Sequence, residues 1–244
     1  MSLPVFIHPD LSAAQAGDAI TLSGPEARHA VTVKRMQQGE KLALIDGTGI
    51  RLTLTVTETS GKDHLTGTVE SVTQLPEPNP RVTVVQAIPK SERAELAVDL
   101  ATQAGADEII AWQADRCVAK WDGKKAPKAI TKWQAAAEAA AKQSRRDRIP
   151  QVRGPLTTRQ LVAELAERAE SARVLVLHEE ATESIREVDL RGEVFLLVGP
   201  EGGIGDEELT TLREVGAVPI KIGPGGFAHR QRGDGGFGGY RHAD

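Results

Sequence analysis

A glycine-rich segment near the end of the chain has the residue types of a ligand-binding loop. An apolar stretch at 193–200, EVFLLVGP, runs directly into Glu201-Gly202-Gly203, and three acidic residues follow at 206–208. Glycine lets backbone N–H and C=O groups approach a ligand without interference from a Cβ atom. The spacing is not the GxGxxG fingerprint of dinucleotide sites, and the acidic residues would repel a phosphate. The segment favours a ligand without phosphates, although a tight strand-to-helix connection with no ligand explains the glycines equally well.

The second chemical signal is a basic stretch between Arg116 and Arg153. It contains eleven Lys or Arg residues and three acids, in a chain whose net charge is -4. A local excess of positive charge of this size is typical of a surface that meets nucleic acid phosphates. A solvated helix face has the same composition, so the charge alone leaves both interpretations open.

A sheet must position the glycine-rich segment, and the second half of the chain has the pattern for one. Strands are predicted at 82–87, 107–113, 173–179, 193–200 and 218–223, and helices at 91–106, 127–146, 157–172 and 206–216. Strands that alternate with helices predict an α/β domain with a mostly parallel sheet covered on both faces. Ligands of such sheets bind at the carboxyl ends of the strands, which is where Gly199 is expected.

The first 74 residues have a different pattern. Segments rich in Thr and Val, with alternating polarity, lie at 19–24, 41–46, 52–59 and 64–72, and a short helix is expected at 26–38. Closely spaced short strands predict a small β-barrel. Three prolines within 75–80 predict a stiff linker between the barrel and the α/β domain.

Composition narrows the function classes. Aromatic residues make up 3% of the chain, which argues against RNA recognition by rows of stacking side chains. No apolar run approaches the roughly 20 residues of a membrane span, and the first residues lack the features of a secretion signal, so a cytoplasmic protein is expected. Cys117 is the only cysteine, and a buried, unreactive thiol is expected.

The histidines do not form a metal motif. His178 is followed by two acids but lacks the second histidine of a zinc-protease helix, and it follows a predicted strand. His8, His29 and His64 are isolated in the sequence, so structural or solvent-exposed positions are expected. No metal site is expected.

Several separated motifs together resemble one enzyme family. The segment 196–209, LLVGPEGGIGDEEL, and the strand end at 222–224 resemble the RsmE family of the SPOUT, or trefoil-knotted, methyltransferases. The segments 87–93, AIPKSER, and 142–150, KQSRRDRIP, resemble the same family. The resemblance covers about 1–224, and the motifs occur in the family's order.

The resemblance implies a fold and an activity. Members of the family have an N-terminal PUA-like β-barrel and a C-terminal α/β SPOUT (trefoil-knot) domain, and they form homodimers. They bind S-adenosylmethionine in the knot and methylate N3 of a uridine in the decoding region of 16S ribosomal RNA, in the small ribosomal subunit. The implied domains are an RNA-binding barrel at 1–74, a linker at 75–80 and a methyltransferase domain at 81–224.

Carried onto this sequence, the resemblance implies three groups of site residues. The cofactor-binding residues are Leu177, His178, Gly199, Pro200, Glu201, Gly202, Gly203, Ile222, Gly223 and Pro224. The residues that face RNA are Lys90, Arg93, Lys142 and Arg148, and the catalytic candidates are Arg145 and Arg146. Basic side chains stabilise the anion that forms when uridine N3 loses its proton, whereas no residue can be named as the general base.

The resemblance stops after Pro224. Residues 225–244, GGFAHRQRGDGGFGGYRHAD, contain seven glycines and cannot form the apolar helix that completes the knot in the family. Back-translation of this tail with GC-rich codons, followed by removal of the first base, gives EVLRTASAGTAGLAAIGTR, which has the family's Leu-Arg loop and an Ala-rich helix. Although the codons are chosen freely, few peptides would give both features in order. We interpret the tail as an out-of-frame replacement of the last knot segment, which impairs activity.

The sequence thus predicts an S-adenosylmethionine-dependent enzyme that methylates uridine N3 in 16S ribosomal RNA. Two alternatives stay open at this point. One is a non-catalytic protein that binds RNA or the ribosome, and the other is a SPOUT methyltransferase with a different RNA target.

Overall fold

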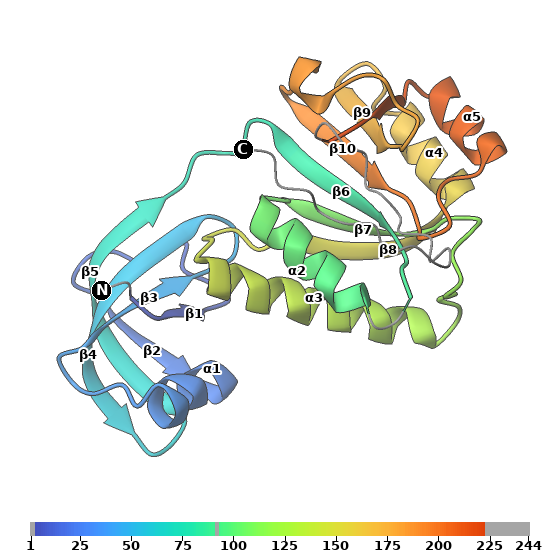
Figure 1. The fold of residues 1–244 in the computed structure, drawn as a ribbon. Coiled ribbons are helices and arrows are strands. Elements are labelled where there is room, and N and C mark those ends of the chain that lie inside the picture. Colours follow the sequence, from blue (N-terminus) through green and yellow to red (C-terminus); the bar gives the residue numbers. More distant parts are fainter. Residues whose placement is uncertain (1–2, 91–92, 223–244) are drawn as a thin grey trace, which may run out of the picture.

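Two β-sheets organise the fold, and the computed structural model describes them over residues 3–90 and 93–222 (Figure 1). The strands of the N-terminal sheet are β1 (Val5–Ile7), β2 (Ala19–Ser23), β3 (Lys41–Ile45), β4 (Ile50–Ser60) and β5 (His64–Gln74). They lie in the order β1-β3-β4-β5-β2, and every neighbouring pair is antiparallel except β1 and β3. Helix α1 (Gly24–Arg28) and the π-helical turn η1 (His29–Val33) bury Ala27 and Ala30 against the core of this sheet.

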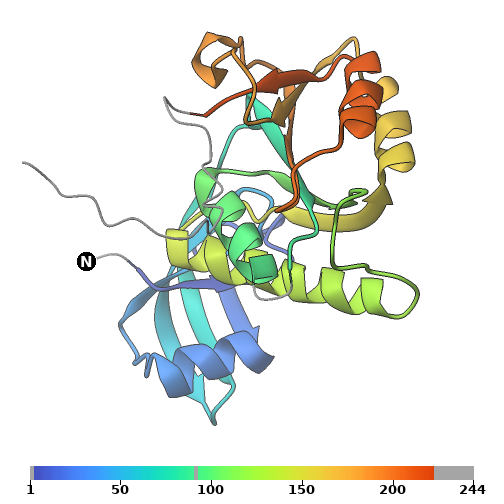
Figure 2. The same ribbon diagram turned by 45° about the vertical axis from the view of Figure 1, so that its right-hand side comes forward.

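The second sheet is parallel throughout and has the order β11-β9-β10-β6-β7-β8. Its strands are β6 (Arg81–Ala87), β7 (Glu108–Gln113), β8 (Gln151–Thr157), β9 (Ala172–Leu177), β10 (Glu193–Val198) and β11 (Val218–Ile220). Its helices are α2 (Ala94–Ala104), α3 (Lys125–Ser144), α4 (Thr158–Ala166) and α5 (Asp206–Glu214). Helices α2 and α3 lie on one face, and α4 and α5 lie on the other (Figures 1 and 2).

Helices from both faces pack into one apolar core around the parallel sheet. Val98 of α2 and Trp133 of α3 are buried on one side, and Leu161 of α4 and Leu212 of α5 are buried on the other. Each such side chain stabilises the fold by about 1.5–3 kcal/mol when it is fully removed from water. The nearly continuous apolar sequence of β7 follows from this arrangement, because a strand covered on both faces has no solvent side.

One half of the sheet face that carries α2 and α3 is covered differently. Leu175, Val194 and Ile220 on β9, β10 and β11 form a small separate cluster with apolar residues of the segment 185–190. Within the described ranges, only this segment, which begins with the short 3-10 helix η3 (Ile185–Glu187), lies over the cluster. Among the residues that the structure describes, this half of the face therefore has a thinner cover than the half under α2 and α3.

All three tryptophans lie in the parallel-sheet half of the molecule. Trp112 on β7 is buried, and its indole N–H donates to the Thr158 hydroxyl of α4 at 3.0 Å. Trp133 on α3 is also buried, and Trp121 meets it edge-on with ring centres 4.8 Å apart. The indole rings thus help to hold helices on both faces of the sheet.

The two sheets meet at the C-terminal end of α3. Lys142 Nζ lies 2.7 Å from Glu26 Oε1, and Arg51 Nη1 lies 2.6 Å from Asp147 Oδ1. All four side chains are largely shielded from solvent, so these ion pairs are screened less than surface pairs. They fix the N-terminal sheet beside the amino ends of the parallel strands, as Figure 1 shows.

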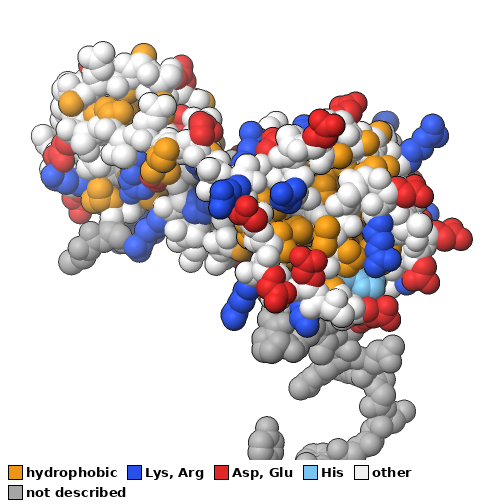
Figure 3. Space-filling view, turned by 90° about the horizontal axis from the view of Figure 1, so that it is seen from above, with side chains coloured by type: hydrophobic (Ala, Val, Ile, Leu, Met, Phe, Trp, Pro, Cys, Tyr) orange, Lys and Arg blue, Asp and Glu red, His pale blue; other side chains and the backbone are white. Residues whose placement is uncertain are grey.

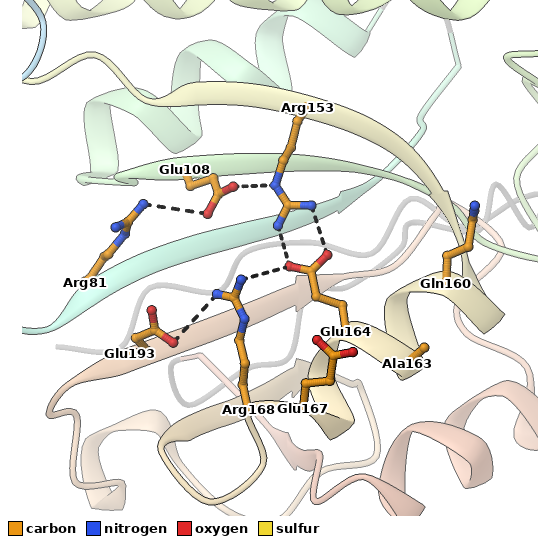
Figure 4. A pocket seen from close by; sticks show the side chains of 9 residues that line it. All are labelled: Arg81, Glu108, Arg153, Gln160, Ala163, Glu164, Glu167, Arg168 and Glu193. Carbon is orange, nitrogen blue, oxygen red and sulfur yellow. Dashed lines mark hydrogen bonds and ion pairs between the residues drawn. The ribbon is translucent and has the colours of Figure 1, made fainter.

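The amino ends of the parallel strands carry a network of alternating charges (Figure 4). Guanidinium and carboxylate groups from four strands, from α4 and from the turn after α4 form a chain of ion pairs. Its members, in order, are Arg81, Glu108, Arg153, Glu164, Arg168 and Glu193. This amino-edge network lines a surface depression of about 1000 Å³, on the edge opposite the carboxyl ends of the strands.

Glu164 makes the stability of the protein depend on pH. Hydrogen bonds from Arg153 hold the pKa of Glu164 below its ordinary value of 4.5. A lowered folded-state pKa stabilises the fold above the unfolded pKa, and this stabilisation is lost as the pH falls through the folded pKa. We expect Glu164→Gln to lower the free energy of unfolding at neutral pH by about 1–3 kcal/mol. The further fall of this free energy with decreasing pH below 4.5 should be less steep in the variant.

Thermal unfolding followed by circular dichroism over this pH range measures both effects. Glu167→Gln is the matched control, because Glu167 is exposed in the same depression and makes no ion pair within the described part of the chain. Equal pH profiles for Glu164→Gln and the parent protein would contradict the prediction.

Candidate cofactor and RNA site

Three chain segments leave the parallel sheet side by side at its carboxyl edge. Leu177, the last residue of β9, pairs with Val198 of β10 and with Ile220 of β11. The N–H of His178 donates to the carbonyl of Ile220 at 3.1 Å. The segments that begin at His178, Gly199 and Lys221 therefore start from neighbouring positions. The structure brings together these predicted cofactor residues up to Ile222, whereas Gly223 and Pro224 lie outside the described residues.

The segment 199–205, called the cofactor loop below after its predicted role, is folded tightly on itself. The N–H of Gly203 donates to the carbonyl of Pro200 at 2.9 Å, and Gly203 has a φ of 70°. A Cβ atom on Gly199 would lie 2.8 Å from Cγ1 of Ile204, which is closer than two carbon atoms can approach. The turn thus requires glycine at Gly199 for packing and favours it at Gly203 for its left-handed backbone.

Two other loops of the carboxyl edge contact the cofactor loop. Glu201 Oε1 accepts the backbone N–H of Lys90, which follows β6, at 3.0 Å. Arg116, which follows β7, donates from Nη1 to the carbonyl of Gly202 at 3.2 Å. The sequence placed Arg116 in the basic stretch but gave no sign of this contact, because the two residues are 86 positions apart.

The predicted basic residues fall into two groups at opposite edges of the sheet. Lys90 and Arg93 are exposed and lie where the chain passes from β6 to α2, at the carboxyl edge. Arg145 and Arg146 follow the last residue of α3, whose 20 residues span about 30 Å. Since α3 runs back from β7 to the start of β8, its end lies at the amino edge, away from the cofactor loop.

The residues at the end of α3 mostly contact the protein itself. Arg148 Nη2 donates to the carbonyls of Leu75 and Pro76 at 3.2 and 3.1 Å, and Lys142 pairs with Glu26 as described above. Arg146 Nη1 donates to the carbonyl of Thr102 at 2.5 Å. Burial lowers the pKa of Arg146.

Arg145 differs from these neighbours. It is exposed and has a φ of 60°, which ends the helix in the left-handed region. Its side chain is thus the most available of the predicted cations at the end of α3.

Other predicted properties can be compared directly with the structure. Cys117 is buried, as expected, and burial raises the pKa of its thiol, which disfavours the reactive thiolate. Among the described residues, no three His, Cys, Asp or Glu side chains gather as metal ligands do. No helix in this part of the chain is long and apolar enough to cross a membrane. Figure 3 shows positive and negative side chains interspersed on the face seen from above, with apolar side chains between them.

Gly199→Ala should weaken cofactor binding. The added Cβ atom would overlap Ile204 and force the cofactor loop to shift, and a misplacement of about 1 Å can cost up to about 100-fold in activity. We expect the dissociation constant for S-adenosylmethionine, measured by calorimetry, to rise at least about 10-fold. Gly205→Ala is the control, since its Cβ atom would make an ordinary 3.5 Å contact with Arg116. If both variants bind like the parent protein, the loop does not shape the site.

Comparison with known proteins first defines the class of the protein. Residues 76–225 match the model of an RNA methyltransferase domain, and residues 22–70 match an RNA methyltransferase PUA domain. A methyltransferase from Legionella pneumophila, solved with the bound cofactor SAM, is 29% identical with a TM-score of 0.79, over 92% of this chain and 90% of that chain. The predicted fold class, an α/β SPOUT domain after a PUA-like domain, is confirmed. The out-of-frame tail predicted at 225–244 lies outside the described residues.

Curated relatives define the particular family. The ribosomal RNA small subunit methyltransferase E of Mycobacterium bovis is 50% identical over 85% of this chain and 80% of its own length. The protein of the same name from Bacillus subtilis is 28% identical over 90% of this chain and 88% of its own length. The chain belongs to the ribosomal RNA small subunit methyltransferase E family.

Proposed function

We propose that the protein transfers the methyl group of S-adenosylmethionine to N3 of a uridine in 16S ribosomal RNA. The observation that carries this proposal is the meeting of the segments after Leu177, Val198 and Ile220 at one edge of the parallel sheet. The bound SAM of the Legionella pneumophila relative supports the cofactor. The names of the curated relatives support a substrate in the RNA of the small subunit.

The cofactor loop fits a ligand of this kind. A Cβ atom on Gly203 would meet no atom within 4 Å, and one on Gly202 would lie an ordinary 3.7 Å from Arg116. Packing within the chain therefore does not require glycine at Gly202, whereas close approach of a ligand to the backbone would. The acidic start of α5, with Asp206 and Glu207 exposed, suits a cationic sulfonium better than a phosphate.

S-adenosylmethionine would supply an electrophilic methyl group on its sulfonium, and the residues of the chain bind and orient the reactants. Leu177, His178 and the cofactor loop would hold the adenosyl group by apolar contact and backbone hydrogen bonds. The uridine N3 must lose its proton, and a cation at the carboxyl edge would stabilise the anion that results. Lys90 and Arg93 are the predicted cations that lie at this edge within the same chain.

A catalytic role of Arg145 and Arg146 requires a second copy of the chain. Both residues lie at the amino edge, about one length of α3 from the cofactor loop. We propose a homodimer in which Arg145 of one protomer reaches the cofactor edge of its partner. Two-fold symmetric dimers present the same pair of surfaces to each other, so both sites would be completed in the same way.

The remaining assignments follow from this function. Residues 1–74 are proposed as the RNA-binding domain, 75–80 as the linker and 81–224 as the methyltransferase domain. RNA contact by Lys142 and Arg148 would have to replace their contacts with Glu26 and with the linker carbonyls. The proposed site of action is the cytoplasm, where ribosomes are assembled.

Primer extension on ribosomal RNA tests the function. A methyl group on N3 blocks base pairing, so reverse transcriptase stops at the modified uridine in the parent strain. We expect the stop to disappear in a strain that lacks the gene and to return when an active copy is supplied. An unchanged stop in the deletion strain would contradict the proposal and favour a non-catalytic ribosome-binding protein or another RNA target.

A further inference from the structure

Glu208 is a buried carboxylate in the first turn of α5. Its side chain is 4% exposed, while the neighbouring acids Asp206 and Glu207 are exposed. Glu208 and Leu212 are four residues apart and share the buried face of the helix. A buried charge is costly unless hydrogen bonds compensate it, so its partners indicate what it does.

Glu208 joins three segments of the carboxyl edge. Its Oε1 atom accepts the backbone N–H of Asp115 at 3.1 Å and the hydroxyl of Thr158. Thr158 in turn accepts the indole N–H of Trp112 at 3.0 Å. The Oε2 atom is buried and has no hydrogen-bond partner among the residues that the structure describes. One carboxylate therefore ties the chain after β7 and the chain after β8 to the helix that follows the cofactor loop.

The contact with Asp115 continues to the cofactor loop through the next residue. Arg116 donates to the carbonyl of Gly202 at 3.2 Å, and its Nε atom would lie 3.5 Å from a Cβ atom on Gly205. The backbone position of Arg116 depends on Asp115, whose N–H is held by Glu208. Glu208 thus acts on the loop from two directions, through Arg116 and through the start of α5.

We propose that Glu208 is a positioning residue that sets the shape of the cofactor loop before a ligand binds. The inference rests on the proposed function only for the identity of that ligand. It assigns Glu208 no contact with the reacting atoms. The effect should therefore be measurable in the ligand-free protein.

Hydrogen exchange of the ligand-free full chain is the first test. In Glu208→Ala, we expect backbone amides of 199–205 and 114–118 to exchange at least about 10-fold faster than in the parent protein. The exchange rates in Glu208→Gln should lie between those of the parent protein and those of Glu208→Ala, because the amide oxygen of Gln can still accept the N–H of Asp115. Glu207→Ala, an exposed acid of the same helical turn, is the matched control and should exchange like the parent. Unchanged exchange at 199–205 in Glu208→Ala would overturn the proposal.

A second variant covers the case in which Glu208→Ala does not fold. Arg116 is exposed, so Arg116→Ala should fold normally and should still accelerate exchange at 199–205 by several-fold, since the contact with Gly202 is lost. Normal protection of the cofactor loop in Arg116→Ala would also overturn the proposal.

Steady-state kinetics separates positioning from catalysis. In Glu208→Gln and Arg116→Ala, we expect KM for S-adenosylmethionine to rise about 10-fold while kcat changes less than about twofold. A fall in kcat with an unchanged KM would contradict a positioning role. If neither the parent protein nor a chain whose residues 225–244 are translated in the shifted frame binds S-adenosylmethionine, the proposed function is wrong, and the exchange experiment alone decides this inference.

Discussion

A chain whose last 20 residues are translated in the shifted frame should bind S-adenosylmethionine at least about 10-fold more tightly than the chain as written. The written tail has seven glycines at 225–244, whereas the shifted reading supplies an apolar, Ala-rich helix. The predicted cofactor wall at 222–224 leads directly into this tail. Within the described ranges, the apolar cluster around Val194 is covered only by the segment 185–190.

Burial of each additional Leu or Ile side chain on this face would contribute about 1.5–3 kcal/mol, which is a large share of a typical stability of about 5–15 kcal/mol. We therefore expect the restored chain to melt at a higher temperature as well. Calorimetric titration of both forms with S-adenosylmethionine measures the affinity, and the DNA sequence around codon 225 tests the frameshift itself. Equal affinity of the two forms would show that the terminal segment does not matter for the cofactor site.

Mixing two inactive variants should restore activity if Arg145 acts across a dimer. Arg145→Ala should lower kcat by about 100-fold, the effect of removing one electrostatic contact to a developing anion. Gly199→Ala weakens cofactor binding instead, so it is inactive when S-adenosylmethionine is kept well below its dissociation constant for that variant. In a mixed dimer, one site combines an intact cofactor loop with an intact Arg145 from the partner. When equal amounts of the two variants exchange subunits at random, about one quarter of the parent activity should therefore return. The activity is measured by transfer of a labelled methyl group to small-subunit RNA.

Lys128→Ala provides the control for this experiment, because Lys128 is an exposed cation on the same helix. Its activity and its behaviour in mixtures should match those of the parent protein. Mixtures that remain as inactive as the separate variants would contradict action across the dimer, and a monomeric protein would exclude it.

The regular elements of the parallel sheet were predictable because their hydrophobic patterns are strong. The strand predicted at 82–87 is β6, and the helix predicted at 127–146 is α3. Strand β8 was not predicted. It contains Gly154 and Pro155 and pairs along only one side, so it lacks the apolar run of a central strand.

Helix ends were less predictable than helix positions. The helix expected at 157–172 ends at Ala166, and turns occupy much of the remainder. The helix expected at 26–38 is replaced by α1 and the π-helical turn η1, which together end at Val33. Such ends depend on tertiary contacts that a local pattern does not contain.

The glycine-rich part of the site could be predicted from the sequence, but its supports could not. Glycines after a buried strand predicted a tight loop at the carboxyl edge, while the pattern alone left open whether a ligand approaches it. The pairing of Lys142 with Glu26 joins residues 116 positions apart, and a charge cluster at a helix end does not reveal such a partner. The sequence showed Glu208 only as one of three acidic residues at a predicted helix start. Its spacing of four residues from the buried Leu212 was the one local signal of its burial.

The positions of the tryptophans give the molecule a built-in spectroscopic label. Trp112, Trp121 and Trp133 are the only tryptophans, and all belong to the half built on the parallel sheet. Intrinsic fluorescence excited at the indole band therefore reports on that half alone, because the N-terminal sheet contains no tryptophan. Far-ultraviolet circular dichroism records both halves. The two signals, followed in one denaturation experiment, distinguish unfolding of the half built on the parallel sheet from unfolding of the N-terminal sheet without any engineered probe.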